Sequence, residues 1–148
     1  MKKVLISSCL LGVSCRYDGR SVPNDNAKNL SDKFLLVPFC PEIYGGLPTP
    51  RIPSERVGER VLSKVGTDVT ENYYRGASEG LKLCHDMGIE IALLKEKSPA
   101  CGNKQIYDGT FSGTLVDGEG VLAELLRKNG IKVYGESQIE DLIKENLF

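Results

Sequence analysis

The sequence predicts a single α/β domain over residues 1–148, with a doubly wound, mostly parallel sheet of four or five strands in a Rossmann-like sandwich. Apolar runs rich in Val, Ile and Leu are typical of buried parallel strands, and they occur at residues 4–6, 34–39, 89–94 and 131–134. Segments with helical hydrophobic spacing separate the later runs. With 148 residues, the chain can bury a core without disulfide bonds.

The first half of the chain contains more loop than helix. A loop is expected at residues 10–23, followed by a short helix at residues 25–30. The second apolar run leads to Cys40 and then to a proline-rich segment, residues 41–53. Each proline fixes its own φ and biases the preceding residue toward an extended conformation, so we expect a shaped loop there. A small hairpin is expected at residues 57–65.

The longest helix is predicted to run from Asp68 to about Met87. Asp68 and Glu71 have the spacing of a capping box, and Gly88 is the residue type that ends helices. Helical periodicity places one set of residues on the buried face: Tyr73, Ala77, Gly80, Leu81, Cys84 and Met87.

Two more helices are predicted in the last third of the chain. The first begins near Gly118 and ends at Gly130, with Val121, Leu122, Leu125 and Leu126 inward. Ser137 and Glu140 suggest a second capping box, which opens a final helix. Its inward residues are expected to be Ile139, Leu142, Ile143 and Leu147.

Composition and charge exclude several kinds of partner. The net charge is −1, with acidic and basic residues interspersed, so nothing favours binding to a nucleic-acid backbone or an anionic membrane. Only three strongly apolar residues follow Lys2 and Lys3, too few for an export signal, and no stretch is long enough to span a bilayer. We therefore expect a cytoplasmic protein with reduced thiols, in which cysteines serve metal binding or catalysis.

Three of the five cysteines follow apolar runs, and this pattern predicts a site. Cys9, Cys40 and Cys101 each come shortly after a predicted strand, among Gly, Pro or Ser. The carboxyl ends of parallel strands meet at one edge of a sheet, where ligands bind. Cys15, beside Arg16 in a loop with two glycines, is a fourth candidate. Cys84 belongs to the buried face of the long helix and is expected to be structural.

The only histidine, His85, is expected to face solvent because it points away from the buried side of its helix. A solvent-facing histidine argues against a Cys/His nucleophile pair and against most zinc sites that contain histidine. No closely spaced Cys-x-x-Cys motif is present either. Well-separated thiols without histidine suit a soft-metal centre, above all an iron–sulfur cluster.

Polar residues near the thiols supply candidates for proton transfer and binding. Glu42, in partly desolvated surroundings, could act as a general acid or base, or could instead cap a helix or pair with an arginine. Ser98 could take part in the chemistry or cap a turn. Arg16, Asp18 and Arg51 could contact a substrate, or an Arg–Asp pair could brace the loops.

These segments resemble the signatures of a known family. Residues 8–12 with 15–19, residues 40–51, and residues 97–102 resemble the three signatures of the thiouracil desulfurases, small prokaryotic iron–sulfur enzymes. The resemblance spans essentially the whole chain, and its middle signature is long and specific. One departure is Ala100, where the family often has Ser, but this change spares Ser98.

The resemblance implies a function, a cofactor and a set of residues. It implies non-redox removal of sulfur from a small thiolated base or nucleoside, giving uracil and hydrosulfide from thiouracil. It implies a [4Fe–4S] cluster held by three of the four cysteines 9, 15, 40 and 101, with one iron open to substrate. Among the four, Cys9, Cys40 and Cys101 are favoured as ligands because each follows a predicted strand. The family's catalytic Glu and Ser correspond to Glu42 and Ser98, which would orient water and move protons.

Two alternatives come from other classes of protein. One is a structural or binding module whose thiols hold zinc with four protein ligands. The other is a metal-free thiol enzyme or small-ligand binding protein, with Cys9 or Cys101 as a reactive thiolate. For the iron–sulfur interpretation, we expect an exposed cluster to be lost in air and its freed thiols to oxidise.

Overall fold

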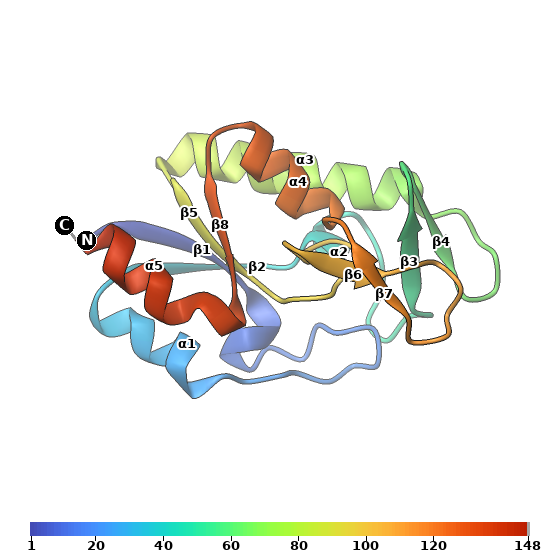
Figure 1. Ribbon diagram of the computed structural model, residues 1–148, viewed down its shortest axis with the longest axis horizontal. Helices are drawn as coiled ribbons and strands as arrows, with labels where there is room; N and C mark the ends of the chain where they lie inside the picture. The colour runs from blue at the N-terminus through green and yellow to red at the C-terminus, as the bar shows by residue number, and fades with distance from the viewer. Residues whose placement is uncertain (148) are drawn as a thin grey trace.

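A computed structural model describes residues 1–147, and its centre is a parallel sheet of four strands (Figure 1). The strands are β1 (Lys3–Ser7), β2 (Leu35–Phe39), β5 (Ile91–Leu94) and β8 (Lys132–Gly135), in the spatial order β2-β1-β5-β8. All three neighbouring pairs are parallel. These strands coincide with the four apolar runs of the sequence. The central strands β1 and β5 are buried, whereas the edge strand β2 is partly exposed, with Leu35 at 48%.

Helices cover both faces of this sheet, so the predicted doubly wound α/β fold is confirmed (Figure 1). On one face lie α3 (Thr70–Met87) and α4 (Val121–Lys128), packed over Leu5 of β1. On the other face, α1 (Asp25–Asn29) and α5 (Ile139–Asn146) pack over Val4 and Ile6. No helix among the described residues is both long and apolar enough to cross a membrane.

The strand order reverses at β1, and this reversal defines where a ligand can bind. The chain passes from β1 to β2 on one side, then returns to place β5 on the other side of β1. Connections therefore diverge at the carboxyl ends of β1 and β5, which is the topological switch point of open α/β sheets. A short 3₁₀ helix, η1 (Ser8–Leu11), follows β1 at this point.

Two small antiparallel hairpins lie beyond the carboxyl edge of the sheet (Figure 1). The first, β3 (Ser54–Val57) with β4 (Arg60–Ser63), corresponds to the predicted hairpin but begins three residues earlier than expected. The second, β6 (Gln105–Tyr107) with β7 (Leu115–Asp117), was not predicted, because strands of three residues are too short to show periodicity.

The segment expected to be only a shaped loop contains a helical turn. Helix α2 (Pro41–Tyr44) begins directly after Cys40, and Pro41 occupies its first turn, where a missing N–H costs nothing. The remaining connections include η2 (Leu30–Asp32) and η3 (Glu136–Gln138).

Neither predicted capping box forms at the predicted residues. Helix α3 begins at Thr70, and Asp68 instead accepts a hydrogen bond from the Thr70 N–H at 2.9 Å. Before α5, the Gln138 side chain accepts from the Gly135 N–H at 2.9 Å, and no Ser137–Glu140 box forms. The helix expected from Gly118 begins at Val121.

One expected core residue is exposed. Leu147 is 41% exposed because α5 ends at Asn146, and Asn146 itself takes the inward position. The buried Asn146 amide donates to the Leu142 carbonyl oxygen at 2.8 Å and to the Tyr134 hydroxyl at 3.1 Å. Helical spacing from Ile139 and Leu142 puts residue 146 on the inward face, and these bonds satisfy its polar side chain there.

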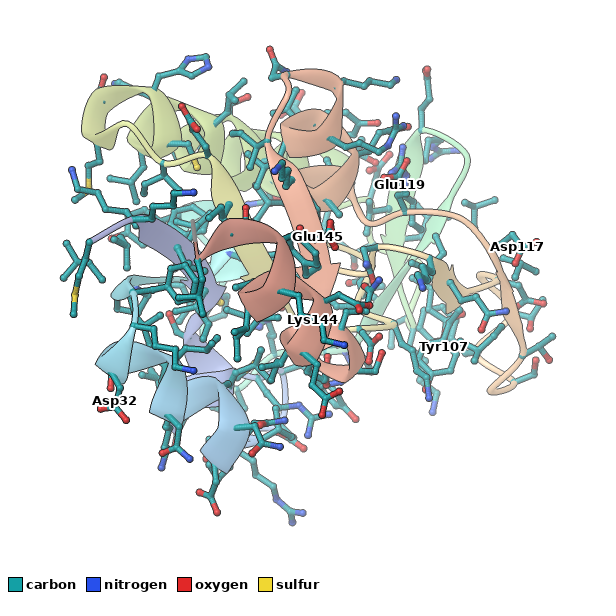
Figure 2. All side chains as sticks on the ribbon, turned by 60° about the vertical axis from the view of Figure 1, so that its left-hand side comes forward. Asp32, Tyr107, Asp117, Glu119, Lys144 and Glu145 are labelled. Atoms are coloured by element: carbon teal, nitrogen blue, oxygen red, sulfur yellow. The ribbon has the colours of Figure 1, made fainter. Side chains whose placement is uncertain are left out.

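Charged side chains are spread over different elements of the molecule. Asp32 follows α1, Lys144 and Glu145 belong to α5, and Glu119 precedes α4 (Figure 2). This distribution agrees with the balanced charge of the sequence.

Candidate active site

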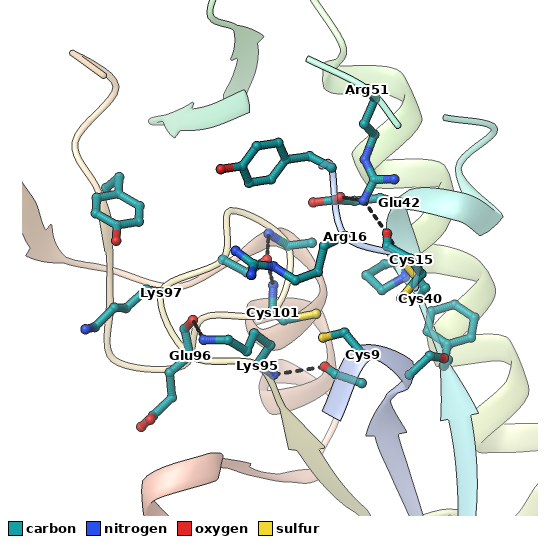
Figure 3. A pocket seen from close by; sticks show the side chains of 18 residues that line it. Cys9, Cys15, Arg16, Cys40, Glu42, Arg51, Lys95, Glu96, Lys97 and Cys101 are labelled. Carbon is teal, nitrogen blue, oxygen red and sulfur yellow. Dashed lines mark hydrogen bonds and ion pairs between the residues drawn. The ribbon is translucent and has the colours of Figure 1, made fainter. Parts of the chain in front are cut away.

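A cavity of about 200 Å³ lies at the switch point, beyond the carboxyl ends of β1, β2 and β5 (Figure 3). The structure brings all six predicted site residues to its wall: Cys9, Cys15, Cys40, Cys101, Glu42 and Ser98. Two further predictions also agree with the structure, since Cys84 is buried in α3 and His85 is exposed. The chain therefore concentrates four of its five thiols in one place.

The first two thiols enter the cavity from the segment that follows β1. Cys9 lies in η1 and is 7% exposed, and η1 ends at Gly12, whose φ of 94° is in the left-handed region. The turn continues to Cys15, whose N–H donates to the Val13 carbonyl oxygen at 2.9 Å. The tight turn thus returns a second thiol to the cavity six residues after the first.

Cys40 and Glu42 are held in place by a close contact between α2 and α3. A Cβ on Gly76 would lie 1.8 Å from the Pro41 carbonyl oxygen, and one on Gly45 would lie 2.1 Å from that of Asn72. Only glycine permits this approach. The Asn72 amide also donates to the Gly45 carbonyl oxygen at 2.8 Å. The backbone between Cys40 and Glu42 is consequently fixed against the longest helix.

Cys101 lies in a loop held between the sheet and the start of α4. The Val121 N–H donates to the Pro99 carbonyl oxygen at 3.0 Å, and a Cβ on Gly120 would lie 2.3 Å from the Ala100 carbonyl carbon. Ser98 Oγ accepts from the N–H groups of Ala100 and Cys101, each at 3.1 Å. Ser98 therefore has the turn-capping role that was one interpretation of the sequence, and it has this role at the wall of the cavity.

The environment of Cys15, Cys40 and Cys101 keeps these three thiols protonated. Burial raises the pKa of Cys101 to about 12, against smaller lowering effects of the Ser7 and Ser98 hydroxyls. The Cys15 thiol raises the pKa of Cys40, and burial raises it further. For Cys15 itself, the hydrogen bond with Cys40 lowers the pKa, but the contact with Cys9 and burial outweigh it and raise the pKa to about 11. A metal that binds here must displace these protons.

Glu42 is fixed at both of its carboxylate oxygens. Oε1 accepts a hydrogen bond from the Tyr73 hydroxyl at 2.9 Å, and Oε2 forms an ion pair with Arg51. The Arg51 side chain is 6% exposed and also donates to the Cys15 carbonyl oxygen at 2.9 Å. The two contacts together fix the orientation of the carboxylate. The pairing of Glu42 with an arginine, one of the alternatives from the sequence, is thus observed.

The expected Arg–Asp brace is not formed. Asp18 accepts a hydrogen bond from the Arg20 N–H at 3.0 Å, and the Arg16 guanidinium lies over the Tyr17 ring at 5.7 Å. Arg16 remains at the cavity wall, which Lys95 and Lys97 also line (Figure 3). Sequence reasoning assigned Tyr73 to the core and missed its polar contact, because helical periodicity predicts the face of a residue but not the partner of its hydroxyl.

The donor set of the cavity fits an iron–sulfur cluster. Four thiols line it, and the only histidine lies elsewhere on the surface. Among residues 1–147, no three His, Cys, Asp or Glu side chains are arranged to hold a single metal ion. Thiols around a cubane lie farther apart than those around one zinc ion, roughly 6–7 Å against roughly 4 Å. Soft thiol donors without nitrogen ligands are the set that such clusters prefer.

Fold and cavity together define a cysteine-rich, doubly wound α/β protein with its site at the switch point of the sheet. Residues 4–138 match the family model of 2-thiouracil desulfurase, and the chain belongs to that family. The chain is 38% identical over 150 residues to the uncharacterized protein YbbK of Bacillus subtilis, with coverage of 95% of this chain and 99% of YbbK. The family predicted from the sequence is thereby confirmed.

A solved structure extends the comparison to the fold. The [4Fe–4S]-dependent thiouracil desulfidase TudS is 46% identical to this chain, with a TM-score of 0.93 and coverage of 98% of this chain and 97% of TudS. The arrangement of strands and helices around the sheet is therefore that of a thiouracil desulfidase.

Proposed function

We propose that this protein is a [4Fe–4S]-dependent desulfidase that converts thiouracil and water into uracil and hydrosulfide. The observation that carries the proposal is the convergence of four thiols and a fixed carboxylate in one cavity at the switch point. The 46% identity to TudS over nearly the whole chain supports it. We further propose a cytoplasmic location, where thiols remain reduced.

Three of the four cavity thiols would hold the cluster. Cys9, Cys40 and Cys101 follow three adjacent strands and enter from three sides, whereas Cys15 reaches the cavity through a longer turn. We therefore favour the first three as ligands. When bound, the cluster supplies a Lewis-acidic iron that is a soft partner for a thiocarbonyl sulfur.

Glu42 would activate water. Its carboxylate borders the same cavity as the thiols, and Arg51 and Tyr73 hold it in one orientation. Glu42 would accept a hydrogen bond from a water molecule and take one of its protons as the oxygen attacks the thiocarbonyl carbon. Oxygen replaces sulfur on the ring, sulfur leaves as hydrosulfide, and one proton is released, so no external electrons are needed.

Ser98 would have two tasks in the same site. Its oxygen accepts from two N–H groups and so fixes the turn that carries Cys101. Its hydroxyl proton remains available to donate to a bound water molecule or to the substrate. We expect this contribution to be smaller than that of Glu42, because another water molecule can partly replace a hydroxyl.

The cavity suits a small flat ring. Phe39, Tyr17 and Tyr107 supply aromatic surface, and charged side chains, among them Arg16 and Lys95, supply polar groups. Aromatic surface combined with placed polar groups is typical of sites for small heterocycles. The substrate class we propose is a thiolated base or nucleoside.

Purification under nitrogen tests the proposal. We expect about four iron and about four sulfide per chain, and release of equal amounts of uracil and hydrosulfide from thiouracil without a reductant. Zinc without iron or sulfide would support a zinc-holding module instead. Metal-free protein with one rapidly alkylated thiol would support a thiol-dependent enzyme.

A further inference from the structure

A second cavity of about 340 Å³ adjoins the first, and Glu42 lies between them. Five residues line both cavities: Arg16, Tyr17, Glu42, Arg51 and Tyr107. The four cysteines line only the first, whereas Tyr73 and Ser54 line only the second. The carboxylate is therefore supported from the side opposite to the thiols.

Tyr73 supports the Glu42 carboxylate through its hydroxyl group. Its side chain is buried, with the residue 3% exposed, and its hydroxyl donates to Glu42 Oε1 at 2.9 Å. Ser54 lies near the same phenol at the wall of the second cavity, where its hydroxyl has a smaller, lowering effect on the pKa of Tyr73. Arg51 occupies the other carboxylate oxygen. Rotation of the carboxylate would break one of these contacts, so its orientation is fixed.

A role as a core residue does not account for the hydroxyl. Phenylalanine would fill the same space on α3 beneath β4, and a buried hydroxyl is unfavourable unless it is hydrogen-bonded. Burial and, after it, the charge of Glu42 raise the pKa of Tyr73 above its ordinary range. The phenol consequently keeps its proton and remains a hydrogen-bond donor to the carboxylate.

We infer that Tyr73 is a positioning residue for desulfuration, acting through the orientation of Glu42. This inference rests on the proposed function, in which Glu42 activates water. Held from the second cavity, the carboxylate presents its remaining lone pairs to the thiol-lined cavity, where substrate and water would meet. Small losses of alignment at a reacting group are costly, since rates depend steeply on the approach of the reacting atoms.

The test compares Tyr73→Phe with Tyr74→Phe, its neighbour on the same helix, which is 39% exposed and lines neither cavity. Turnover of thiouracil is measured per bound cluster, together with KM and iron content. For Tyr73→Phe we expect kcat to fall by roughly 10- to 100-fold, with KM and iron content nearly unchanged. Tyr74→Phe should match wild type.

A double-mutant cycle separates positioning from a general structural effect. If Tyr73 acts through the carboxylate, Tyr73→Phe should cost little further turnover once Glu42→Gln is present. Ser54→Ala, which leaves helix α3 intact, should give a milder loss of kcat and keeps the test valid if Tyr73→Phe folds poorly. Two outcomes would overturn this inference but not the proposed function. One is wild-type kcat per cluster in both Tyr73→Phe and Ser54→Ala, and the other is fully additive losses in the cycle. Absence of turnover in cluster-loaded wild type would overturn the proposed function with it.

Discussion

Arg51 ties the main chain of Cys15 to the rest of the site: its Nη2 donates to the Cys15 carbonyl oxygen at 2.9 Å. The same nitrogen pairs with Glu42, and Nη1 donates to the Pro48 carbonyl oxygen at 3.1 Å. A single buried guanidinium thus joins a thiol-bearing loop, the carboxylate and the segment after α2. An arginine with these contacts organises the site as well as balancing its charge.

Arg51→Met should therefore damage the site in two ways. It leaves Glu42 without its ion-pair partner and frees the loop at Cys15, so we expect turnover per cluster to fall by about 100-fold and iron content to fall as well. Iron analysis and thiouracil assays check both effects. Arg60→Met removes an exposed arginine that pairs with Asp68 and should change neither. Equal behaviour of the two variants would contradict this organising role.

Ser98→Ala should affect both the fold of the loop and the chemistry. The substitution removes the acceptor of the Ala100 and Cys101 N–H groups, so the turn that carries Cys101 loosens. We expect a loss of stability of about 1 kcal/mol in urea denaturation and about a tenfold loss of turnover per cluster. Ser78→Ala, on the exposed side of α3, serves as the control. A loss of turnover as large as that of Glu42→Gln would contradict the lesser role assigned to Ser98.

Iron loading should strengthen as the pH rises. The pKa of Cys101, about 12, lies well above neutrality and that of Cys40 is raised as well, so metal binding must release protons from these two proposed ligands. Loading should improve steadily from about pH 6.5 to about pH 8.5, since protons compete less at higher pH. Competition with a chelator at each pH, corrected for the chelator's own protonation, measures the effect. Loading independent of pH would mean that the thiols are already ionised.

Exposure to air should oxidise the cavity thiols before the core thiol. The Cys40 thiol donates to the Cys15 carbonyl oxygen at 4.0 Å, and the two thiols shift each other's pKa, so loss of the cluster leaves two neighbouring sulfurs that can form a disulfide. Mass spectrometry of alkylated peptides should show this pair joined in aerobic protein and Cys84 free. Aerobic protein with full, stable iron content, or with Cys84 oxidised first, would contradict the expectation.

The sheet and the site edge could be predicted because each depends on a local pattern. Buried parallel strands are short apolar runs, and a thiol placed after such a run must lie at the carboxyl edge. The hairpin β6–β7 and helix α2 escaped prediction because segments of three or four residues show no periodicity.

The polar contacts of the site could not be predicted, because they join residues far apart in the sequence. Glu42 and Tyr73 are 31 residues apart, and their contact depends on the approach of α2 to α3 at Gly76. Asp68 and Ser137 each had a suitable capping sequence, yet each helix begins two residues after the predicted capping residue. Other local hydrogen bonds form there, from the Thr70 N–H to Asp68 and from the Gly135 N–H to Gln138.

The most direct test is the turnover of Glu42→Gln per bound cluster. The substitution keeps the size of the side chain and removes its ability to accept a proton, while leaving all four cavity thiols in place. We expect the iron–sulfur absorption spectrum and iron content of wild type, with thiouracil turnover lowered by about 10²–10⁴-fold. Cys101→Ser, by comparison, should lose cluster and activity together. Wild-type turnover per cluster in Glu42→Gln would show that the carboxylate is structural and that the proposed mechanism is wrong.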